Sequence, residues 1–301
     1  MSKDVKVKRN KKYDTFSITM ELERPLLYDE VENKDDKNNN RKFNIKNKIF
    51  KGIGILFVLI LLGFFIWINK TYEPQKLAKE ALVSNSKVEV TVNENISFTP
   101  KGRKVSKGLI LYPGAKVEIE SYAPLARKIA ESGYEVVIVK MPLNLAILGT
   151  NKAQKVMDSY NNIEHWVIGG HSLGGVAASN FARDNKLIEG VVFLASYPMG
   201  DELKELGKKV ISIWGSKDGV VNFKSLVESK QKLPDDTTYV EIEGGNHAQF
   251  GDYGKQKGDN DAIISQEKQL NITANSIIKF LKNISCLLYT SDAADERSSV
   301  D

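Results

Sequence analysis

The spacing of hydrophobic and polar residues changes three times along this chain of 301 residues. Residues 1–49 are polar, as in "NKDDKNNNRK", and their few apolar residues follow no period. A segment of this composition cannot bury enough apolar surface to offset the entropy of ordering. We therefore predict a disordered cytoplasmic tail over 1–49, an apolar run over 50–69, a helical juxtamembrane linker over 70–86 and a folded domain over 87–285.

The apolar run "GIGILFVLILLGFFIWI", residues 52–68, has the length and composition of a transmembrane helix once Ile49 and Phe50 are included. A buried core helix would have a polar face, and a cleaved signal peptide would have a shorter leader and a small-residue cleavage site. Lysines crowd the N-terminal flank, whereas only Lys70 lies close to the other end. By the positive-inside rule, 50–69 is a single-pass signal anchor in the cell membrane, with the N-terminus cytoplasmic and the folded domain outside.

From residue 87 onward, apolar strands alternate with amphipathic helices. The segments "KVEVTV" and "NISFTP" have the alternation of an antiparallel pair. Continuous apolar strands follow in "GLILYPG", "YEVVIVKMP", "HWVIGG", "GVVFLAS", "KVISIWGS" and "TTYVEIEGG", and a helix over about 262–282 closes the domain. This rhythm predicts the α/β fold class, with a doubly wound and mostly parallel sheet.

The last sixteen residues, "CLLYTSDAADERSSVD", continue none of these patterns. They resemble one reading frame of a transposon mosaic-end adaptor used to prepare sequencing libraries. We therefore expect residues 286–301 to be a non-native tail, with the natural sequence interrupted near Ser285, and exclude them from the fold.

Composition limits the kinds of function that the chain can have. The formal net charge of +5 comes from residues 1–51, which hold 14 Lys/Arg and 9 Asp/Glu, so the remainder is neutral. A neutral domain gives no electrostatic reason to bind nucleic acid. The single cysteine, Cys286, excludes an internal disulfide framework, and three scattered histidines do not suggest a metal centre. We predict no metal, no cofactor and no nucleic-acid partner.

Ser172 lies in "GGHSLGG", where the strand "HWVIGG" turns into the small-residue helix "LGGVAASNFA". The G-x-S-x-G pattern alone arises by chance in roughly one chain in ten of this length. Its place between a strand and a helix is that of a nucleophile elbow, a strained turn that projects the serine hydroxyl above the sheet. The sequence therefore predicts Ser172 as a nucleophile at the carboxyl end of a strand.

A serine hydroxyl is a poor nucleophile until a base takes its proton. Asp218 follows the strand "ISIWG" and His247 follows "YVEIEGG", which is the order nucleophile, acid, histidine expected after an elbow. We predict that His247 deprotonates Ser172 and later protonates the leaving group, while Asp218 holds the imidazole tautomer and stabilises the imidazolium. Asp201, after the preceding strand, is the alternative acid.

The oxyanion of an acyl-transfer intermediate needs two backbone N–H donors. We expect one from Leu173, directly after the nucleophile, and the other from the loop after "LILYPGA", at Ala115 with Gly114 as the next candidate. Two histidines compete with this assignment: His171 is expected to pack beside the turn, and His165, at the other end of its strand, to be structural.

Together these motifs resemble the α/β-hydrolase superfamily, particularly its small bacterial domains related to dienelactone hydrolases. The resemblance covers roughly 88–282 and rests on "LILYPGAKVE", "YAPLARKIAESGYEVVIVKMPLNLAILG", "GGHSLGG", "GSKDGVV" and "GGNHAQFGDYG". It implies the triad Ser172, Asp218 and His247 and no metal. Dienelactone hydrolase itself uses a cysteine nucleophile, so Ser172 favours a serine esterase. The short link between "GVVFLASYP" and "KVISIWGS" predicts an open site without a lid.

We therefore expect a membrane-anchored serine hydrolase that cleaves small-molecule carboxylic esters or related acyl substrates through an acyl-enzyme. An acyltransferase and a peptidase are alternatives that would use the same triad. A non-catalytic anchored binding module is the alternative of a different class, and the three triad residue types at the expected strand ends argue against it.

Overall fold

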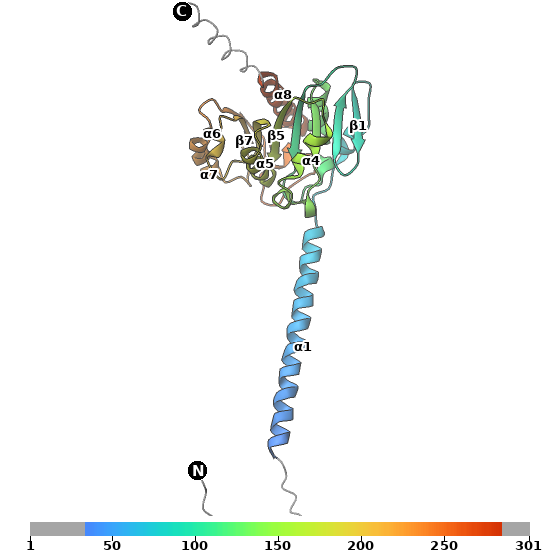
Figure 1. The fold of residues 1–301 in the computed structure, drawn as a ribbon, viewed down its shortest axis with the longest axis vertical. Coiled ribbons are helices and arrows are strands. Elements are labelled where there is room, and N and C mark those ends of the chain that lie inside the picture. Colours follow the sequence, from blue (N-terminus) through green and yellow to red (C-terminus); the bar gives the residue numbers. More distant parts are fainter. Residues whose placement is uncertain (1–33, 285–301) are drawn as a thin grey trace, which may run out of the picture. The chain divides into compact units, whose positions relative to one another are not determined.

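The computed structural model of the protein describes residues 34–284, and Figure 1 shows how its helices and strands are arranged. The chain divides into two compact units, residues 1–60 and 61–301. The predicted tail up to residue 33 and the predicted non-native tail over 286–301, with Cys286, lie outside the described residues.

Helix α1 (Lys34–Asn69) has 36 residues and includes the apolar run. Its segment Lys46–Trp67 has a mean hydropathy of 2.7 and is long and apolar enough to cross a membrane. The helix begins at Lys34, within the segment that the sequence predicts to be disordered. Extending a helix that has already nucleated costs far less than starting one, which lets α1 continue into polar sequence.

Eight strands form one sheet in the order β1-β2-β4-β3-β5-β6-β7-β8. Only the pairs β1–β2 and β2–β4 are antiparallel, and the other five pairs are parallel. The predicted antiparallel pair and the mostly parallel sheet are thus confirmed. The strands are β1 (Val88–Val92), β2 (Ile96–Pro100), β3 (Lys107–Tyr112), β4 (Glu135–Ile138), β5 (His165–His171), β6 (Ile188–Leu194), β7 (Lys209–Gly215) and β8 (Thr238–Ile242).

Helices cover both faces of the sheet (Figure 1). Alternate residues of one strand enter different cores: Leu109 and Leu111 of β3 pack with α3 and α8, whereas Ile110 packs with α4 and α5. Such strands are buried on both faces, which is why their sequences are continuously apolar. The helices are α2 (Lys76–Ala81), α3 (Ala123–Glu131), α4 (Lys152–Ser159), α5 (Leu173–Asp184), α6 (Glu202–Glu205), α7 (Phe223–Glu228) and α8 (Gln266–Asn283).

Short 3₁₀ helices lie in the loops between these elements: η1 (Ile119–Tyr122), η2 (Pro142–Asn144), η3 (Ala146–Leu148), η4 (Ser229–Lys232) and η5 (Ala248–Phe250). The segment between β6 and β7, residues 195–208, contains only the single-turn helix α6. A segment this short is consistent with the predicted absence of a lid. The carboxyl ends of six parallel strands therefore meet at one open edge of the sheet, called here the carboxyl edge.

The predicted linker over 70–86 is part of the folded domain. Tyr72 forms a parallel β-bridge with Val117, and Ala78 of α2 is completely buried. The Ala78 N–H donates to Asp252 Oδ2 at 2.8 Å. The sequence hides this packing because the buried face of α2 consists of alanines, which give little hydrophobic periodicity.

Candidate active site

Ser172 lies at the turn between β5 and α5 and is half-buried. Its φ of 53° and ψ of −123° fall in a region that residues with a Cβ rarely adopt. Hydrogen bonds hold the peptide groups on both sides: Ser172 N donates to Leu194 O at 2.9 Å, and Ser196 Oγ donates to Ser172 O at 2.6 Å. Neighbouring strands thus keep this residue in its strained conformation, as a nucleophile elbow requires.

The glycines of the motif allow backbone segments to approach closely around the turn. A Cβ on Gly170 would lie 2.2 Å from the carbonyl carbon of Gly174. A Cβ on Gly174 would lie 2.4 Å from Pro113 O, in the loop after β3. Because backbone atoms cannot yield as a flexible side chain can, both positions require glycine. This packing brings the first turn of α5 against the loop after β3.

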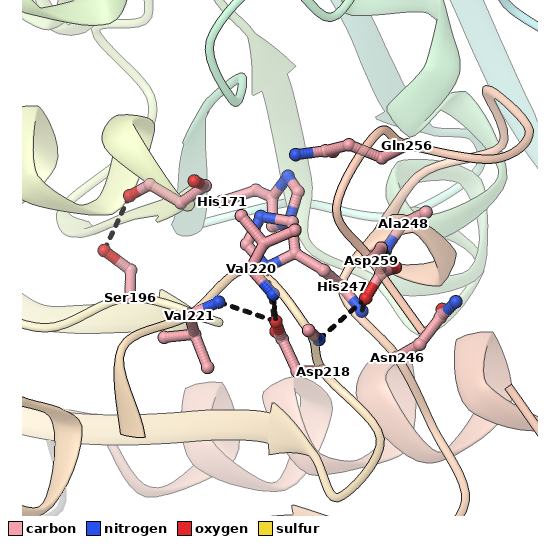
Figure 2. Close-up of polar contacts among 12 residues, drawn as sticks. His171, Ser196, Asp218, Val220, Val221, Asn246, His247, Ala248, Gln256 and Asp259 are labelled. Atoms are coloured by element: carbon pink, nitrogen blue, oxygen red, sulfur yellow. Dashed lines mark hydrogen bonds and ion pairs between the residues drawn. The ribbon is translucent and has the colours of Figure 1, made fainter. Parts of the chain in front are cut away.

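Asp218 follows β7 and His247 follows β8, and both side chains are buried. His247 Nδ1 lies 2.8 Å from Asp218 Oδ2 (Figure 2). The other carboxylate oxygen, Asp218 Oδ1, accepts hydrogen bonds from Val220 N at 2.8 Å and Val221 N at 2.7 Å. The backbone thus orients the carboxylate toward the imidazole, and an ionised Asp218 favours the tautomer with its proton on Nδ1.

The second ring nitrogen of His247, Nε2, is buried. Over residues 34–284, no group makes a hydrogen bond to this nitrogen, and the Ser172 hydroxyl does not bond it either. With the proton on Nδ1, Nε2 carries a free lone pair. Asp218 thus contacts one ring nitrogen of His247, and the other ring nitrogen is left unoccupied.

His171 precedes the turn and lies beside His247, with 4.4 Å between the ring centroids. The His171 side chain is completely buried, and its Nδ1 lies 2.9 Å from Tyr122 Oη. Burial, and next to it the nearby charge of a protonated His247, hold the pKa of His171 well below its ordinary value. His171 is thus a neutral imidazole that does not compete for the proton of His247.

Two backbone N–H groups near Ser172 are free. Within the described part of the chain, no acceptor bonds the N–H of Leu173, at the start of α5, or that of Ala115. Gly114 differs, because its N–H donates to Tyr122 Oη at 2.8 Å. Of the three expected oxyanion donors, Gly114 is therefore already engaged, and Leu173 and Ala115 are available.

The remaining sequence candidates lie apart from this arrangement. The carboxylate bonded to His247 is that of Asp218, not the alternative Asp201, which precedes α6. His165, at the amino end of β5, pairs through Nδ1 with Glu189 Oε1 at 2.6 Å.

The sequence pattern does not identify three further residues that support the site: Tyr122, Ser196 and Asp259. Tyr122 contacts His171, Ser196 contacts Ser172, and Asp259 contacts Gly219, which lie 49, 24 and 40 positions away along the chain. The only signal is the position of Ser196, just past the end of a strand.

Comparison with known families gives one match. The model of a family described as "Alpha/beta hydrolase family" matches residues 108–271, which is more than half of the chain. The matched segment begins in β3 and ends in α8, so it includes the turn at Ser172 and both loops with Asp218 and His247. No curated protein sequence matches the chain.

Three solved structures illustrate the similarity of the fold. The esterase domain of a Rhodothermus marinus protein is 11% identical, with a TM-score of 0.50 over 65% of this chain and 98% of that one. Est1E from Butyrivibrio proteoclasticus with bound ferulic acid is 12% identical, with a TM-score of 0.50 over 65% and 97%. A soluble variant of the monoglyceride lipase from Saccharomyces cerevisiae is 12% identical, with a TM-score of 0.50 over 70% and 97%. At these identities the likeness concerns the fold alone.

Proposed function

This chain belongs to the alpha/beta hydrolase family, and we propose that it is a membrane-anchored serine hydrolase that cleaves carboxylic esters. The observation that carries the proposal is the buried Asp218–His247 pair. Nε2 of His247 is free, and the strained turn at Ser172 lies at the same edge of the sheet. The esterase and lipase named among similar folds agree with it. No other activity has a comparable observation in its favour.

In the proposed reaction, Ser172 Oγ attacks the carbonyl carbon of the ester while His247 Nε2 takes the hydroxyl proton. This step requires Ser172 Oγ to come within hydrogen-bond reach of His247 Nε2. Asp218 keeps the imidazole in the required tautomer and stabilises the imidazolium. His171 supports this step by staying neutral, because a second positive ring at 4.4 Å would oppose protonation of His247.

The negative charge that develops on the carbonyl oxygen is received by the free N–H groups of Leu173 and Ala115. The intermediate then collapses: the ester C–O bond breaks, the alcohol leaves with the proton from His247, and the acyl group stays on Ser172. Water, deprotonated by His247, attacks the acyl-enzyme and releases the carboxylic acid.

Membrane anchoring is the second part of the proposal. The segment Lys46–Trp67 supports it by length and hydropathy, and the lysines before it support a cytoplasmic N-terminus. The hydrolase domain then lies on the extracytoplasmic side.

The decisive experiment is labelling of the full chain with a fluorophosphonate probe, which reacts with activated serines. We expect labelling of the wild type, complete loss in Ser172→Ala and unchanged labelling in Ser132→Ala, which changes an exposed serine at the end of α3. Ester hydrolysis should fall at least about 10³-fold in Ser172→Ala. A folded wild type that never labels would falsify the proposal. Adding an acceptor alcohol to the assay tests for the acyltransferase, because a transferase forms a new ester.

A further inference from the structure

The chain leaves the candidate membrane span close to the proposed site. Trp67 ends that span, and Tyr72, five residues later, is paired with the loop after β3. Tyr72 N donates to Lys116 O at 2.7 Å, and Glu118 N donates to Tyr72 O at 3.0 Å. Both bonds are made by residues that closely follow Ala115, one of the two free N–H donors. Five extended residues reach at most about 18 Å, so the chain cannot hold this loop farther than that from Trp67.

Large apolar side chains are exposed on the loops of the same carboxyl edge. They follow three different strands, β4, β6 and β7, whose ends surround β5 and Ser172. Their exposed fractions lie between 38% and 65%, for Leu143, Ile147, Leu148, Met199, Val220 and Phe223. We call these six residues the apolar rim. Apolar side chains that gather at a site are typical of surfaces that contact a lipid or a hydrophobic ligand.

From the short tether and the apolar rim we propose that the substrate is an ester lipid of the membrane that holds the anchor. This inference rests on the proposed function, since it assigns a substrate class to that hydrolase. A soluble ester would reach the site equally well if the tether between the span and the domain were long. A short tether that ends beside the oxyanion loop favours a substrate that cannot leave the bilayer. The lipid acyl chain replaces water over the apolar rim.

The reaction with such a lipid breaks and forms the same types of bond as the ester hydrolysis proposed above. The bond between the acyl carbon and the glycerol-type oxygen breaks, and a bond between that carbon and Ser172 Oγ forms. The alcohol leaves with the proton from His247, and water then releases a free fatty acid. Because no lid covers the carboxyl edge, binding to the bilayer requires no opening step.

The test uses the full chain in phosphatidylcholine vesicles that contain a fluorogenic diacylglycerol, with a short-chain p-nitrophenyl ester added to the water. The quantity compared is the ratio of the two hydrolysis rates. In the double variant Ile147→Ser/Leu148→Ser, we expect this ratio to fall about tenfold, since two apolar contacts with the acyl chain are lost. The matched control Leu187→Ser/Leu206→Ser changes exposed leucines before β6 and β7, at the opposite edge, and should keep the wild-type ratio.

A second variant tests the tether. A flexible insertion of about 20 Gly/Ser residues between Lys70 and Thr71 adds a root-mean-square reach of about 25 Å. The longer tether lowers the effective concentration of the site at the bilayer surface. We expect the ratio to fall severalfold with the rate on the soluble ester retained. If the wild type cleaves the soluble ester but not the vesicle lipid, or if both variants keep the ratio, the lipid assignment is wrong and the hydrolase stands. If neither substrate is cleaved, the proposed function itself fails.

A different observation assigns a role to Asp259. Its Oδ1 accepts hydrogen bonds from Gly219 N at 2.9 Å and from His247 N at 3.3 Å, and its Oδ2 accepts one from Ala248 N at 2.8 Å (Figure 2). Gly219 directly follows Asp218. One carboxylate thus joins the backbone beside the acid to the backbone of the base.

We infer that Asp259 is a positioning residue that keeps His247 and Asp218 in register. It does not reach the reacting atoms, so its effect on the proposed reaction passes through the 2.8 Å bond between those two side chains. In Asp259→Asn, an amide N–H₂ group replaces one of the two carboxylate oxygens. Because this group cannot accept a hydrogen bond from a backbone N–H, at least one of the hydrogen bonds that link this side chain to the two loops is lost. The control Asp261→Asn changes an exposed aspartate that pairs with Lys255.

For Asp259→Asn we expect kcat on the soluble ester to fall at least about tenfold, with KM within about twofold, because acid–base catalysis is weakened while substrate contacts persist. Asp261→Asn should keep both constants. A variant that melts at a lower temperature but keeps the wild-type kcat would show that Asp259 is merely structural. A variant that does not fold is replaced by Asp259→Glu, which retains the charge and is expected to retain a larger share of kcat.

Discussion

Ser172 has a strained backbone conformation at the centre of the site. Its conformation costs on the order of 1–3 kcal/mol for a residue with a Cβ, whereas glycine would adopt it easily. Bonds to Leu194 and Ser196 hold the turn in place. A serine where glycine would be more stable agrees with the proposed role of the hydroxyl. Tyr122, which lies nearby, also helps to hold the site in place.

Tyr122 Oη joins the loop after β3 to the elbow, since it accepts from Gly114 N and bonds His171 Nδ1. In Tyr122→Phe both partners stay buried without a hydrogen bond. We expect the free energy of unfolding to fall by about 2 kcal/mol, and kcat to fall about tenfold as the Ala115 N–H loses its position. Urea unfolding and steady-state kinetics measure the two effects. The control Tyr239→Phe, on the edge strand β8, should change neither.

Glu135 is a buried carboxyl group outside the site, with 1% of its surface exposed. Burial raises its pKa to about 7, although hydrogen bonds from Thr99 and Tyr160 oppose the shift. Between pH 4.5 and about 7 the folded state therefore binds more protons than the unfolded state, and stability falls as pH rises through this window.

The variant Glu135→Gln removes the ionisation. We expect its free energy of unfolding to exceed that of the wild type by about 1–3 kcal/mol at pH 8 and to match it near pH 4.5. Urea titrations at the two pH values measure the difference. Glu164→Gln, an exposed control, should follow the wild type at both. Equal stability of wild type and Glu135→Gln at pH 8 would contradict this account.

At the scale of elements, the site depends on how β5, α5 and the loop after β3 pack. The motif glycines bring these backbones into direct contact, and that contact sets the distance between the Leu173 and Ala115 N–H groups. The loops after β7 and β8, which hold Asp218 and His247, are neighbours because those strands are parallel and adjacent. The sheet order therefore assembles residues that are 29 positions apart in the chain.

Gly174→Ala tests this packing. The added Cβ would lie 2.4 Å from Pro113 O and 2.5 Å from Tyr112 O, so α5 and the loop must separate. We expect a loss of about 1–3 kcal/mol in the free energy of unfolding and at least about a 100-fold slower reaction with the fluorophosphonate. In the control Gly207→Ala no atom lies within 4 Å of the new Cβ, although φ is 60°. That variant should be slightly less stable and should label at the wild-type rate.

The strand and helix patterns predicted most elements correctly, because buried parallel strands are continuously apolar and cannot be confused with amphipathic helices. The packing of Tyr72 and α2 onto the domain could not be predicted in this way. Small alanines and a single β-bridge leave no period in the sequence, and their partners, Val117 and Asp252, lie 45 or more residues away.

At the scale of the whole molecule, an apolar helix precedes a neutral hydrolase domain. The charge imbalance lies before the apolar run over 52–68, and this asymmetry predicts which side of the membrane each part occupies. We expect the full chain to stay in the membrane fraction after washing with carbonate and to dissolve in detergent. In intact cells, protease should cleave an epitope tag placed after Lys282 and spare a tag before Ser2. Protection of the hydrolase domain would reverse the predicted orientation.

The sequence by itself determined the class of the fold and the candidate span, and it predicts the chemistry at Ser172, Asp218 and His247. These follow from local patterns: continuous apolar strands, an apolar run, and reactive residues just past strand ends. Only the tertiary structure decided that Gly114 is engaged while Ala115 is free, that His171 packs on His247, and that Asp259 joins the acid and base loops. The contacts of His171 with His247 and of Asp259 with Gly219 join residues that are 76 and 40 positions apart in the chain. A single hydrogen bond between such residues depends on how the sheet and loops pack and leaves no repeating pattern in the sequence.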